Sequence, residues 1–413
     1  MYPYRKPLAS PGILRKSLLI FSGAEIQNRR RIRLFEMTPS KSKNRVVLAV
    51  TNDLISDQRL EKVCATLLSL GFSPLLIGRK RRTSPELPRK EWRTHRMHLL
   101  FEKGPLFYAE YNLRLILWLL FHRADLIVAN DLDTLPACFL ASLLKRKPIV
   151  YDSHEFYTET PELIHRPFTR NIWLSIEKSI FPKLDRIITV NKSIAQEYKI
   201  RYGKELYIIK NLPRKLITHS LPSPAKKPDG KKVILLQGAG INIDRGAEEL
   251  VQAMQYLPNV MLWIIGSGDV MDILKELIIK HHLEDRITIF GRVAYEELTA
   301  YTLAADLGIS IDKDTNPNYR FSLPNKLFDY IRCQTPVLVS RLPEIAQIVE
   351  QYNVGEFIES HDPKHIADRI NTLLSNEQKM SQYKNNCSIA SEELTWEHQT
   401  DTMKEIYLPF LKD

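Results

Sequence analysis

Residues 233–255 read VILLQGAGINIDRGAEELVQAMQ. The stretch opens on four consecutive apolar residues, passes through a glycine-containing turn, and ends in apolar residues at helical spacing. A short apolar strand followed at once by an amphipathic helix is the βα unit from which parallel sheets are built. This stretch therefore predicts that a Rossmann-like domain begins close to residue 233.

Similar units recur on both sides of this stretch, so the chain is expected to hold two Rossmann-like βα domains facing across a cleft. Its 413 residues exceed the size at which a single core stops growing. Prolines 222, 224 and 228 predict a linker between the domains. We predict an α/β protein with these parts: a basic, disordered extension (1–44), a first domain (45–213), a linker (214–230), a second domain (231–389) and a C-terminal helix that crosses back to the first domain (390–413).

The strands and some helices of both domains follow from the same alternation. Gly71 is expected to close a helix over residues 60–70, and residues 396–411 are expected to form the crossing helix. Strands are expected at residues 46–50, 74–77, 126–129, 149–151, 186–190 and 207–209, and in the second domain at residues 233–236, 261–265, 287–290, 307–311 and 337–339.

The basic charge of the chain is concentrated in its N-terminal segment. Residues 1–43 hold ten Lys or Arg and two Glu, which is +8 of the net charge of +11. This distribution, without an aromatic and basic stacking platform, argues against nucleic acid as a partner. Either Met37 is the authentic start, or the segment is an arm that touches anionic lipid.

The four cysteines lie far apart and show no metal-ligand spacing, which predicts reduced, buried thiols in a cytoplasmic protein. No apolar run is long enough to span a membrane. Residues 113–121 are apolar on most sides, which predicts either a buried helix or a surface helix at the inner face of the membrane. Exposed aromatic side chains there would favour the surface helix, and burial of Trp118 and Leu119 would refute it.

Ligands of open parallel sheets bind beyond the carboxyl ends of the strands. In the turn after residue 236, Gly238 and Gly240 permit close approach to the backbone, and Arg245 adds a positive charge beside a helix start. We expect this turn, with Asn242, to bind phosphate, although an ordinary glycine-rich turn is the alternative. Gly268, after the next strand, is a weaker candidate of the same kind.

Residues 318–330, NYRFSLPNKLFDY, form a second candidate site for a phosphate-containing ligand. Pro324 and Ser322 predict the start of a helix that faces the cleft. The backbone N–H groups of Ser322 and Leu323 are expected to contact a pyrophosphate. Lys326 is expected to neutralise phosphate charge, and Asp329 to accept hydrogen bonds from ribose hydroxyls.

The first domain supplies the candidate catalytic residue and the candidate residues that bind an acceptor substrate. His154 follows a predicted strand and has carboxylates beside it, so it is expected to act on a reacting hydroxyl or to polarise a carbonyl, although a lone histidine is often structural. Its neighbour Glu155 is assigned to the acceptor. Asp53 and Asp57, in the loop after the first strand, suit an acceptor and equally suit a structural turn. That loop has no glycine, which argues against a dinucleotide site.

Taken together, these motifs resemble glycosyltransferase family 4, the retaining group with the GT-B fold, from about residue 45 to the C-terminus. The most specific segments are LPNKLFDY (323–330), TPV (335–337) and LPEI (342–345), and GAGINIDRG (238–246), GSG (266–268) and DSHE (152–155) agree with them. The run NDLD (130–133) looks like the D-x-D metal motif of the other large glycosyltransferase architecture. We expect it to organise a loop, and we expect no metal and no cofactor.

The resemblance implies that the second domain binds a nucleotide-sugar and the first domain its acceptor. Arg245 and Lys326 would neutralise the departing pyrophosphate without a metal. Asp329 stands where the second Glu of the family's E-x7-E motif contacts ribose. His154 matches the family's active-site histidine, and Arg292 falls where the nucleobase rests against backbone. The chain departs from the family at Phe321, where the first Glu belongs.

The predicted function is transfer of a sugar from a nucleotide-sugar to a glycan, glycolipid or other hydroxyl acceptor, with retention of configuration, in polysaccharide or related glycan synthesis. The acceptor is a glycan or is linked to lipid, so the enzyme is expected to be cytoplasmic with a peripheral contact to anionic membrane. The alternatives are a sugar-nucleotide epimerase with the GT-B fold and a binding protein without catalysis.

Overall fold

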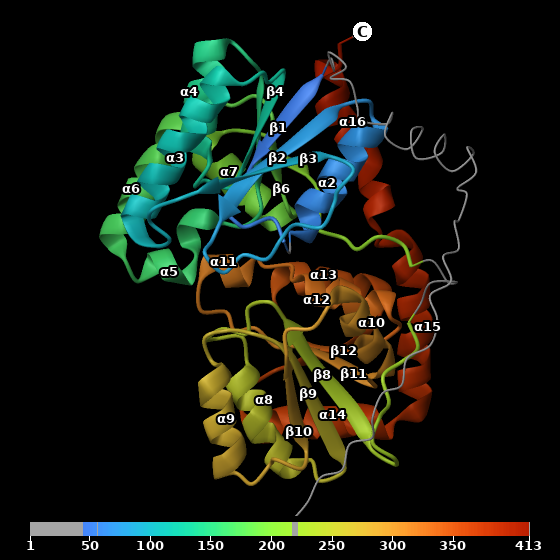
Figure 1. The fold of residues 1–413 in the computed structure, drawn as a ribbon. Helices are drawn as coiled ribbons and strands as arrows, with labels where there is room; N and C mark the ends of the chain where they lie inside the picture. The colour runs from blue at the N-terminus through green and yellow to red at the C-terminus, as the bar shows by residue number, and fades with distance from the viewer. Residues whose placement is uncertain (1–43, 56, 217–221, 413) are drawn as a thin grey trace, which may run out of the picture. The chain divides into compact units, whose positions relative to one another are not determined.

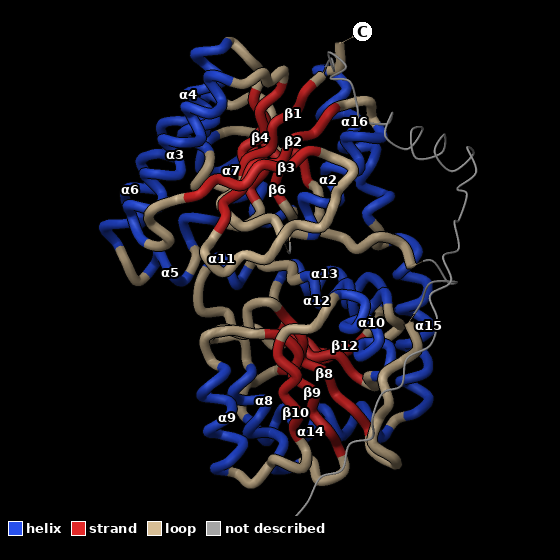
Figure 2. Tube along the Cα trace, in the orientation of Figure 1, coloured by secondary structure: helices blue, strands red, loops and turns tan. Residues whose placement is uncertain are grey.

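The computed structural model describes residues 44–55, 57–216 and 222–412. The predictions for the basic extension and for Met37 therefore lie outside the described residues. Within the described part, the strands form two separate sheets, which confirms the predicted fold class (Figures 1 and 2). No helix in those ranges is both long and apolar enough to cross a membrane.

The first sheet has seven parallel strands in the order β3-β2-β1-β4-β5-β6-β7. The strand order reverses beside β1, which creates the switch point where α/β proteins bind ligands. Its strands are β1 (Arg45–Ala49), β2 (Ser73–Lys80), β3 (Arg93–His98), β4 (Leu126–Asn130), β5 (Ile149–Ser153), β6 (Ile187–Thr189) and β7 (Tyr207–Ile208).

The second sheet has six parallel strands in the order β10-β9-β8-β11-β12-β13. Its winding follows that of the first sheet, with β8 in the place of β1. Its strands are β8 (Lys232–Gly238), β9 (Val260–Gly266), β10 (Ile287–Gly291), β11 (Leu307–Ser310), β12 (Val337–Ser340) and β13 (Gly355–Ile358).

Helices cover both faces of each sheet. Figure 1 labels most of them. Those of the first domain are α2 (Gln58–Ser69), α3 (Gly104–Phe121), α4 (Leu135–Lys145), α5 (Pro161–Ile164), α6 (Pro167–Ile180) and α7 (Lys192–Tyr202). Those that follow β8 are α8 (Ala247–Ala253), α9 (Met271–Lys280), α10 (Tyr295–Ala304), α11 (Pro317–Arg320), α12 (Asn325–Arg332), α13 (Pro343–Tyr352), α14 (Pro363–Ser375), α15 (Glu377–Glu393) and α16 (Thr400–Tyr407).

The alternation within each central strand explains why the sheets are covered on both faces. In β1, Val47 and Ala49 pack into the core that holds α3 and α4, whereas Val46 and Leu48 pack into the core that holds α2 and α16. Both sets are fully buried. A strand that is buried on both faces appears as a continuous apolar run, as these residues do.

The structure corrects the predicted C-terminal helix over residues 396–411. This stretch instead comprises a 3-10 turn at Trp396–Gln399, the short helix α16 and a second 3-10 turn at Leu408–Phe410. Pro409 cannot donate a helical hydrogen bond, and its ring crowds the carbonyl four residues earlier, so α16 ends at Tyr407 and the chain continues as a 3-10 turn. The segment packs on the first domain, where Trp396 Nε1 donates to Thr66 Oγ1 at 2.9 Å.

The structure supports the buried-helix prediction for part of residues 113–121 and leaves the membrane contact a prediction. Leu115 and Leu119 are buried in the core of the first domain, and Trp118 is partly buried. On the other face Leu113 is 60% exposed and Phe121 is 83% exposed. The helix is therefore a core helix with an exposed apolar face.

Candidate active site

A cleft of about 1080 Å³ is lined by loops that follow the carboxyl ends of strands in both sheets. It brings together most of the predicted site residues: Asp57, His154, Glu155, Gly238, Arg245, Arg292, Ser322, Leu323, Lys326 and Asp329. The predicted residues that do not line it are Asp53, Gly240, Asn242 and Gly268.

Two cations of the cleft are held by one buried carboxylate that the sequence analysis did not single out. Asp312 follows β11 and has a fully buried side chain. Its Oδ2 lies 3.0 Å from Arg245 Nη1, and its Oδ1 lies 3.4 Å from Lys326 Nζ. Arg245 also stacks over the ring of Tyr319 at 4.3 Å. The arrangement positions two positive charges against one negative charge, which leaves an excess positive charge for an anion.

Burial lowers the pKa of Lys326, and the carboxylate of Asp312 opposes that effect. Lys326 lies in the first turn of α12, where helical N–H groups also favour negative charge. A carboxylate directly after a predicted strand was the available signal for Asp312, because such positions open on the ligand side of a parallel sheet.

Gly240, Asn242 and Gly268 shape the glycine turn and do not line the cleft. A Cβ on Gly268 would lie 1.8 Å from the carbonyl oxygen of Ile241, so only glycine permits the two turns to pack. Asn242 Oδ1 accepts from the backbone N–H of Asp269 at 3.3 Å. Gly268 and Asn242 thus help to hold the turn that presents Gly238, and the predicted phosphate contacts of Gly240, Asn242 and Gly268 stay predictions.

The start of α12 differs from its prediction. Pro324 occupies the N-cap position, and Asn325 begins the helix without a side-chain cap. The N–H of Ser322 donates to the carbonyl of Tyr319 at 3.0 Å, so it is not free for a pyrophosphate. The Ser322 hydroxyl is buried and has no hydrogen-bond partner in the described ranges, and the N–H of Leu323 has none there either.

Asp329 lies on the cleft side of α12 and is oriented by two neighbours. Tyr295 Oη donates to Asp329 Oδ1 at 3.0 Å, and Arg332 Nη2 lies 3.6 Å from the same oxygen. Burial raises the pKa of Asp329, and Arg332 and Tyr295 counteract this rise. Neither neighbour was predicted. Only the fold brings Tyr295 of α10 beside α12, whereas Arg332 lies on α12 itself, where its i,i+3 spacing from Asp329 was the available signal.

His154 is held between two carboxylates. Its Nδ1 lies 3.3 Å from Asp131 Oδ2, and its backbone N–H donates to Asp131 Oδ1 at 2.8 Å. Its Nε2 lies 3.4 Å from Asp152 Oδ2 but without hydrogen-bond geometry. Asp152 in turn forms a buried ion pair with Arg59 at 2.8 Å.

The carboxylates determine the charge of His154. Burial alone would lower its pKa, but Asp131 and Asp152 raise it to about 9. The imidazole is therefore protonated near neutral pH and is not available there as a general base. It can donate a hydrogen bond or stabilise negative charge. Of the actions predicted on a reacting hydroxyl, this excludes removal of its proton near neutral pH.

Asp53 and Asp57, in the loop after β1, make hydrogen bonds mainly within that loop and its neighbours. Asp57 caps α2 by accepting from the N–H of Leu60 at 3.0 Å, and its other oxygen accepts from Asn52. Asp53 accepts from the N–H of Ile55 and from the hydroxyl of Ser84. Both carboxylates are thus occupied, as expected for the structural-turn alternative, and only Asp57 borders the cleft.

The D-x-D run is also engaged by protein groups. Asp131 binds His154, and Asp133 Oδ2 accepts from Thr51 Oγ1 at 2.6 Å. Burial and the adjacent Asp131 raise the pKa of Asp133 to about 7. Within the described ranges no group of three or more His, Cys, Asp or Glu is arranged to hold a metal ion.

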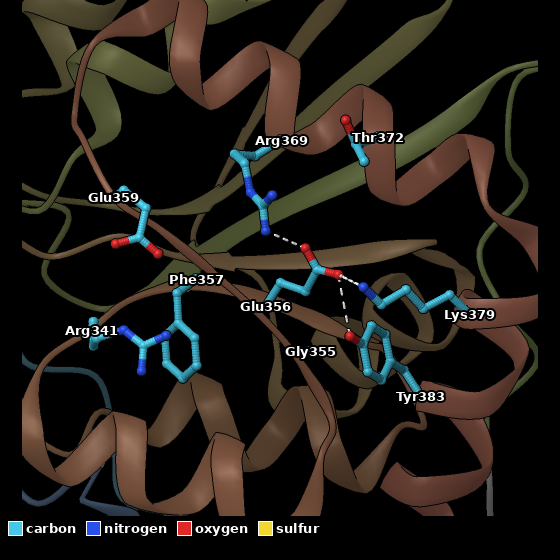
Figure 3. Close-up of a pocket in the computed structure, with 9 residues that line it drawn as sticks. All are labelled: Arg341, Gly355, Glu356, Phe357, Glu359, Arg369, Thr372, Lys379 and Tyr383. Atoms are coloured by element: carbon cyan, nitrogen blue, oxygen red, sulfur yellow. Dashed lines mark hydrogen bonds and ion pairs between the residues drawn. The ribbon is translucent and has the colours of Figure 1, made fainter.

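A second, shallow pocket of about 330 Å³ lies beside the edge strand β13 (Figure 3). Arg369 and Lys379 both point at the carboxylate of Glu356, which also accepts from Tyr383 Oη at 3.2 Å. The pocket is lined by three cations, Arg341, Arg369 and Lys379, and by two carboxylates, Glu356 and Glu359. None of the predicted site residues lines it.

Comparisons with known proteins agree with this geometry. The family model for "Glycosyltransferase Family 4" matches residues 58–212, and the model for "Glycosyl transferases group 1" matches residues 221–388. D-inositol 3-phosphate glycosyltransferase of Xylanimonas cellulosilytica is 20% identical over 249 residues, which are 56% of this chain and 58% of that protein. The chain thus matches less than two thirds of the length of that relative.

Solved structures share the fold. Sucrose-phosphate synthase of Thermosynechococcus elongatus has a TM-score of 0.72 at 18% identity, over 89% of this chain and 99% of that one. The Anabaena protein HepE, solved with UDP and glucose, has a TM-score of 0.65 at 17% identity, over 87% and 98%. Since each of the two family models covers one βα domain and together they match most of the residues, the chain belongs to glycosyltransferase family 4, with the GT-B fold.

Proposed function

We propose that this protein transfers a sugar from a nucleotide-sugar to a hydroxyl group of a glycan or lipid-linked acceptor. The observation that carries the proposal is the pair of cleft cations, Arg245 and Lys326, on the buried carboxylate of Asp312. A pyrophosphate leaving group gains negative charge as the glycosidic bond breaks, and preorganised cations lower the energy of that state. In this proposal no resident metal is required.

The remaining cleft residues fit the other parts of such a donor. Asp329, oriented by Tyr295, would accept hydrogen bonds from ribose, and Arg292 borders the end of the cleft assigned to the nucleobase. His154, as an imidazolium, would stabilise negative charge near the sugar. Retention of configuration follows from the family resemblance and is part of the proposal.

The names of similar proteins support the same chemical class. HepE was solved with UDP-glucose, and TarM of S. aureus was solved with UDP and α-GlcNAc-glycerol. The curated relative is named for transfer to D-inositol 3-phosphate. These ligands belong to those proteins; for this chain they make a uridine nucleotide the first donor to test.

The test is a thermal-shift and turnover screen against UDP-, GDP-, ADP- and CMP-sugars, with and without EDTA. At a hundredfold excess over Kd, a bound donor is expected to add about 2.7 kcal/mol to stability. Asp329→Ala is expected to abolish most of this shift, because it removes the proposed ribose acceptor. Folded protein that responds to no nucleotide would refute the proposed function, and sensitivity to EDTA would refute its metal independence.

Glu356→Ala provides a matched control for Asp329→Ala. Both carboxylates lie in the second domain, accept from a tyrosine hydroxyl and pair with an arginine, but Glu356 lies outside the cleft. The Glu356 variant is expected to lose stability and to keep its nucleotide response. An equal loss of response in both variants would assign the effect to folding.

We further propose that the outer face of α3, α4 and α6 contacts an anionic membrane. These helices lie along one side of the first sheet, and α4 packs against both others (Figure 1). Arg123, Arg146 and Arg166 are exposed at their ends. The exposed apolar side chains of this face are Leu106, Leu113, Leu117 and Phe121 of α3, Leu140, Leu143 and Leu144 of α4, and Phe168 and Ile172 of α6. Exposed apolar residues with basic neighbours suit the surface of an anionic bilayer.

Sedimentation with lipid vesicles tests this contact. The protein is expected to sediment with vesicles of phosphatidylcholine and phosphatidylglycerol, less so at high salt, and Leu117→Asp with Phe121→Asp is expected to abolish most binding. Ile279→Asp is the matched control, because Ile279 is an exposed (63%) helical residue of the second domain, with an exposure between those of Leu117 (46%) and Phe121 (83%). Equal binding of all variants would refute the proposed surface.

A further inference from the structure

Glu155 lies where the two domains meet. Its Oε2 accepts from Nδ2 of Asn318 at 3.4 Å, and Oδ1 of Asn318 accepts from the backbone N–H of Phe156 at 3.0 Å. Asn318 belongs to α11 of the second domain and is 8% exposed. The side chain of Glu155 is therefore positioned by the domain that carries the donor cations, although the sequence analysis assigned it to the acceptor.

Phe321 leaves this part of the cleft without the carboxylate that the family motif would supply. Its side chain packs against the core of the first domain, and its carbonyl accepts from Asn191 Nδ2 at 2.7 Å. The next residue, Ser322, lines the cleft with a buried hydroxyl that has no partner in the described ranges. The Phe321 side chain thus faces the first domain, whereas the adjacent Ser322, at the wall of the cleft, keeps a buried hydroxyl without a partner in the described ranges.

The other carboxylates that line the cleft have interaction partners or exposure that differ from those of Glu155. Asp57 caps α2, Glu61 pairs with Lys90, and Asp329 is bound by Tyr295. Glu296 is an exposed residue of α10. Among the cleft carboxylates, Glu155 is the one beside His154.

The surroundings of Glu155 favour a neutral carboxyl group. Burial, together with the carboxylates of Asp131 and Glu162, raises its pKa to about 8. A protonated carboxyl both donates and accepts hydrogen bonds, and a sugar hydroxyl does the same. A ligand that carried its own carboxylate would instead be repelled by these acidic neighbours.

We propose that Glu155, positioned by Asn318, binds hydroxyl groups of the donor sugar together with the Ser322 hydroxyl, and that it selects neutral hexoses over uronic acids. This inference rests on the proposed function. It adds which residues of the donor site bind the sugar part of the nucleotide-sugar. It replaces the carboxylate absent at position 321 with one from the other domain, so the sugar would contact both domains at once.

Calorimetric titration with UDP, GDP and ADP, each alone and as its glucose conjugate, separates the two claims. Glu155→Ala is expected to weaken binding of the glucose conjugate by about tenfold, the worth of one or two hydrogen bonds, and to leave the free nucleotide within about twofold. Equal effects on both ligands, or none, would overturn the inference while the proposed function stood. Wild-type protein that binds no free nucleotide would refute both.

Glu155→Gln keeps the shape of the side chain and removes its titration. Wild-type affinity for the glucose conjugate is expected to fall as the pH rises above about 8, whereas the affinity of Glu155→Gln is expected to stay level. UDP-glucuronate is expected to bind wild type at least about tenfold more weakly than UDP-glucose. A flat wild-type profile, or equal affinity for the two sugars, would contradict the inference.

Glu162→Gln is the control for a general loss of negative charge. Glu162 is exposed and lies outside the cleft, but its carboxylate helps to raise the pKa of Glu155. The variant is expected to bind the glucose conjugate normally at pH 7 and to lose affinity at a lower pH than wild type does. A loss of binding at pH 7 as large as that of Glu155→Ala would contradict a specific role for Glu155.

Discussion

Lys326→Ala is expected to lower kcat/KM for sugar transfer by about 10²–10³-fold, the usual cost of removing one preorganised group that stabilises transition-state charge. Lys326 is 10% exposed and lies in the first turn of α12, with its Nζ 3.4 Å from Asp312 Oδ1. Because the charge of the pyrophosphate grows as the bond breaks, most of the loss should fall on kcat. Turnover with the donor found in the nucleotide screen measures it.

The fold is expected to survive this substitution. Asp312 keeps its ion pair with Arg245 at 3.0 Å, so no buried charge is left without a partner. Lys313→Ala is the matched control. Lys313 directly follows Asp312 in the sequence and pairs with Glu249, but it does not line the cleft. Equal losses in the two variants, or full activity in Lys326→Ala, would contradict the role assigned to Lys326.

Arg59→Ala is expected to lower the free energy of unfolding by about 3–5 kcal/mol, because it leaves the buried Asp152 carboxylate without its main partner. Both side chains of this ion pair are nearly inaccessible, and Arg59 also donates to the carbonyl of Ile209 at 2.9 Å. The ion pair connects α2 to β5, and the hydrogen bond connects α2 to the residue after β7. Denaturation by urea at pH 7, followed by a signal from the first domain, measures the change.

The pH dependence of this loss has a defined sign. Burial would raise the pKa of Asp152, but Arg59 and His154 lower it well below its usual range. The contribution to stability is therefore complete above the pKa of the unfolded carboxyl, about 3.9, and declines as the pH falls below it. The difference between wild type and variant should shrink in acid. Lys275→Ala, which breaks an exposed ion pair, is expected to leave the midpoint unchanged.

Much of the fold could be predicted because its strands are apolar on both faces. The predicted strands of both sheets all appear, with shifts at their ends. The two strands that were missed, β3 and β13, are the outer strands on one side of each sheet. The sequence of β3, RTHRMH, has no apolar run, because an edge strand is covered less completely than a central one. Its pairing with β2 is a tertiary contact, and local pattern does not report it.

The residues of the candidate site were likewise predicted only in part. Arg245, Lys326 and Asp329 were identified from local motifs, because a strand or helix end carries its own glycine, proline and charge pattern. Asp312 and Tyr295 were not identified, since they reach these residues from other elements of the second domain. Arg332 was also missed, although it lies on α12 itself, three residues after Asp329. Asp53 and Asp57 were assigned to a ligand, but the folded loop uses their carboxylates itself.

The amino-acid sequence by itself determined that this protein has two βα domains and that the second begins with a glycine-containing turn that carries Arg245. These features repeat over short distances along the chain, where backbone geometry and apolar spacing set the outcome. Only the tertiary structure decided that His154 is protonated and that Glu155 is held by the opposite domain. The charge of His154 and the orientation of Glu155 depend on Asp131, Asp152 and Asn318, which approach them only when the chain folds.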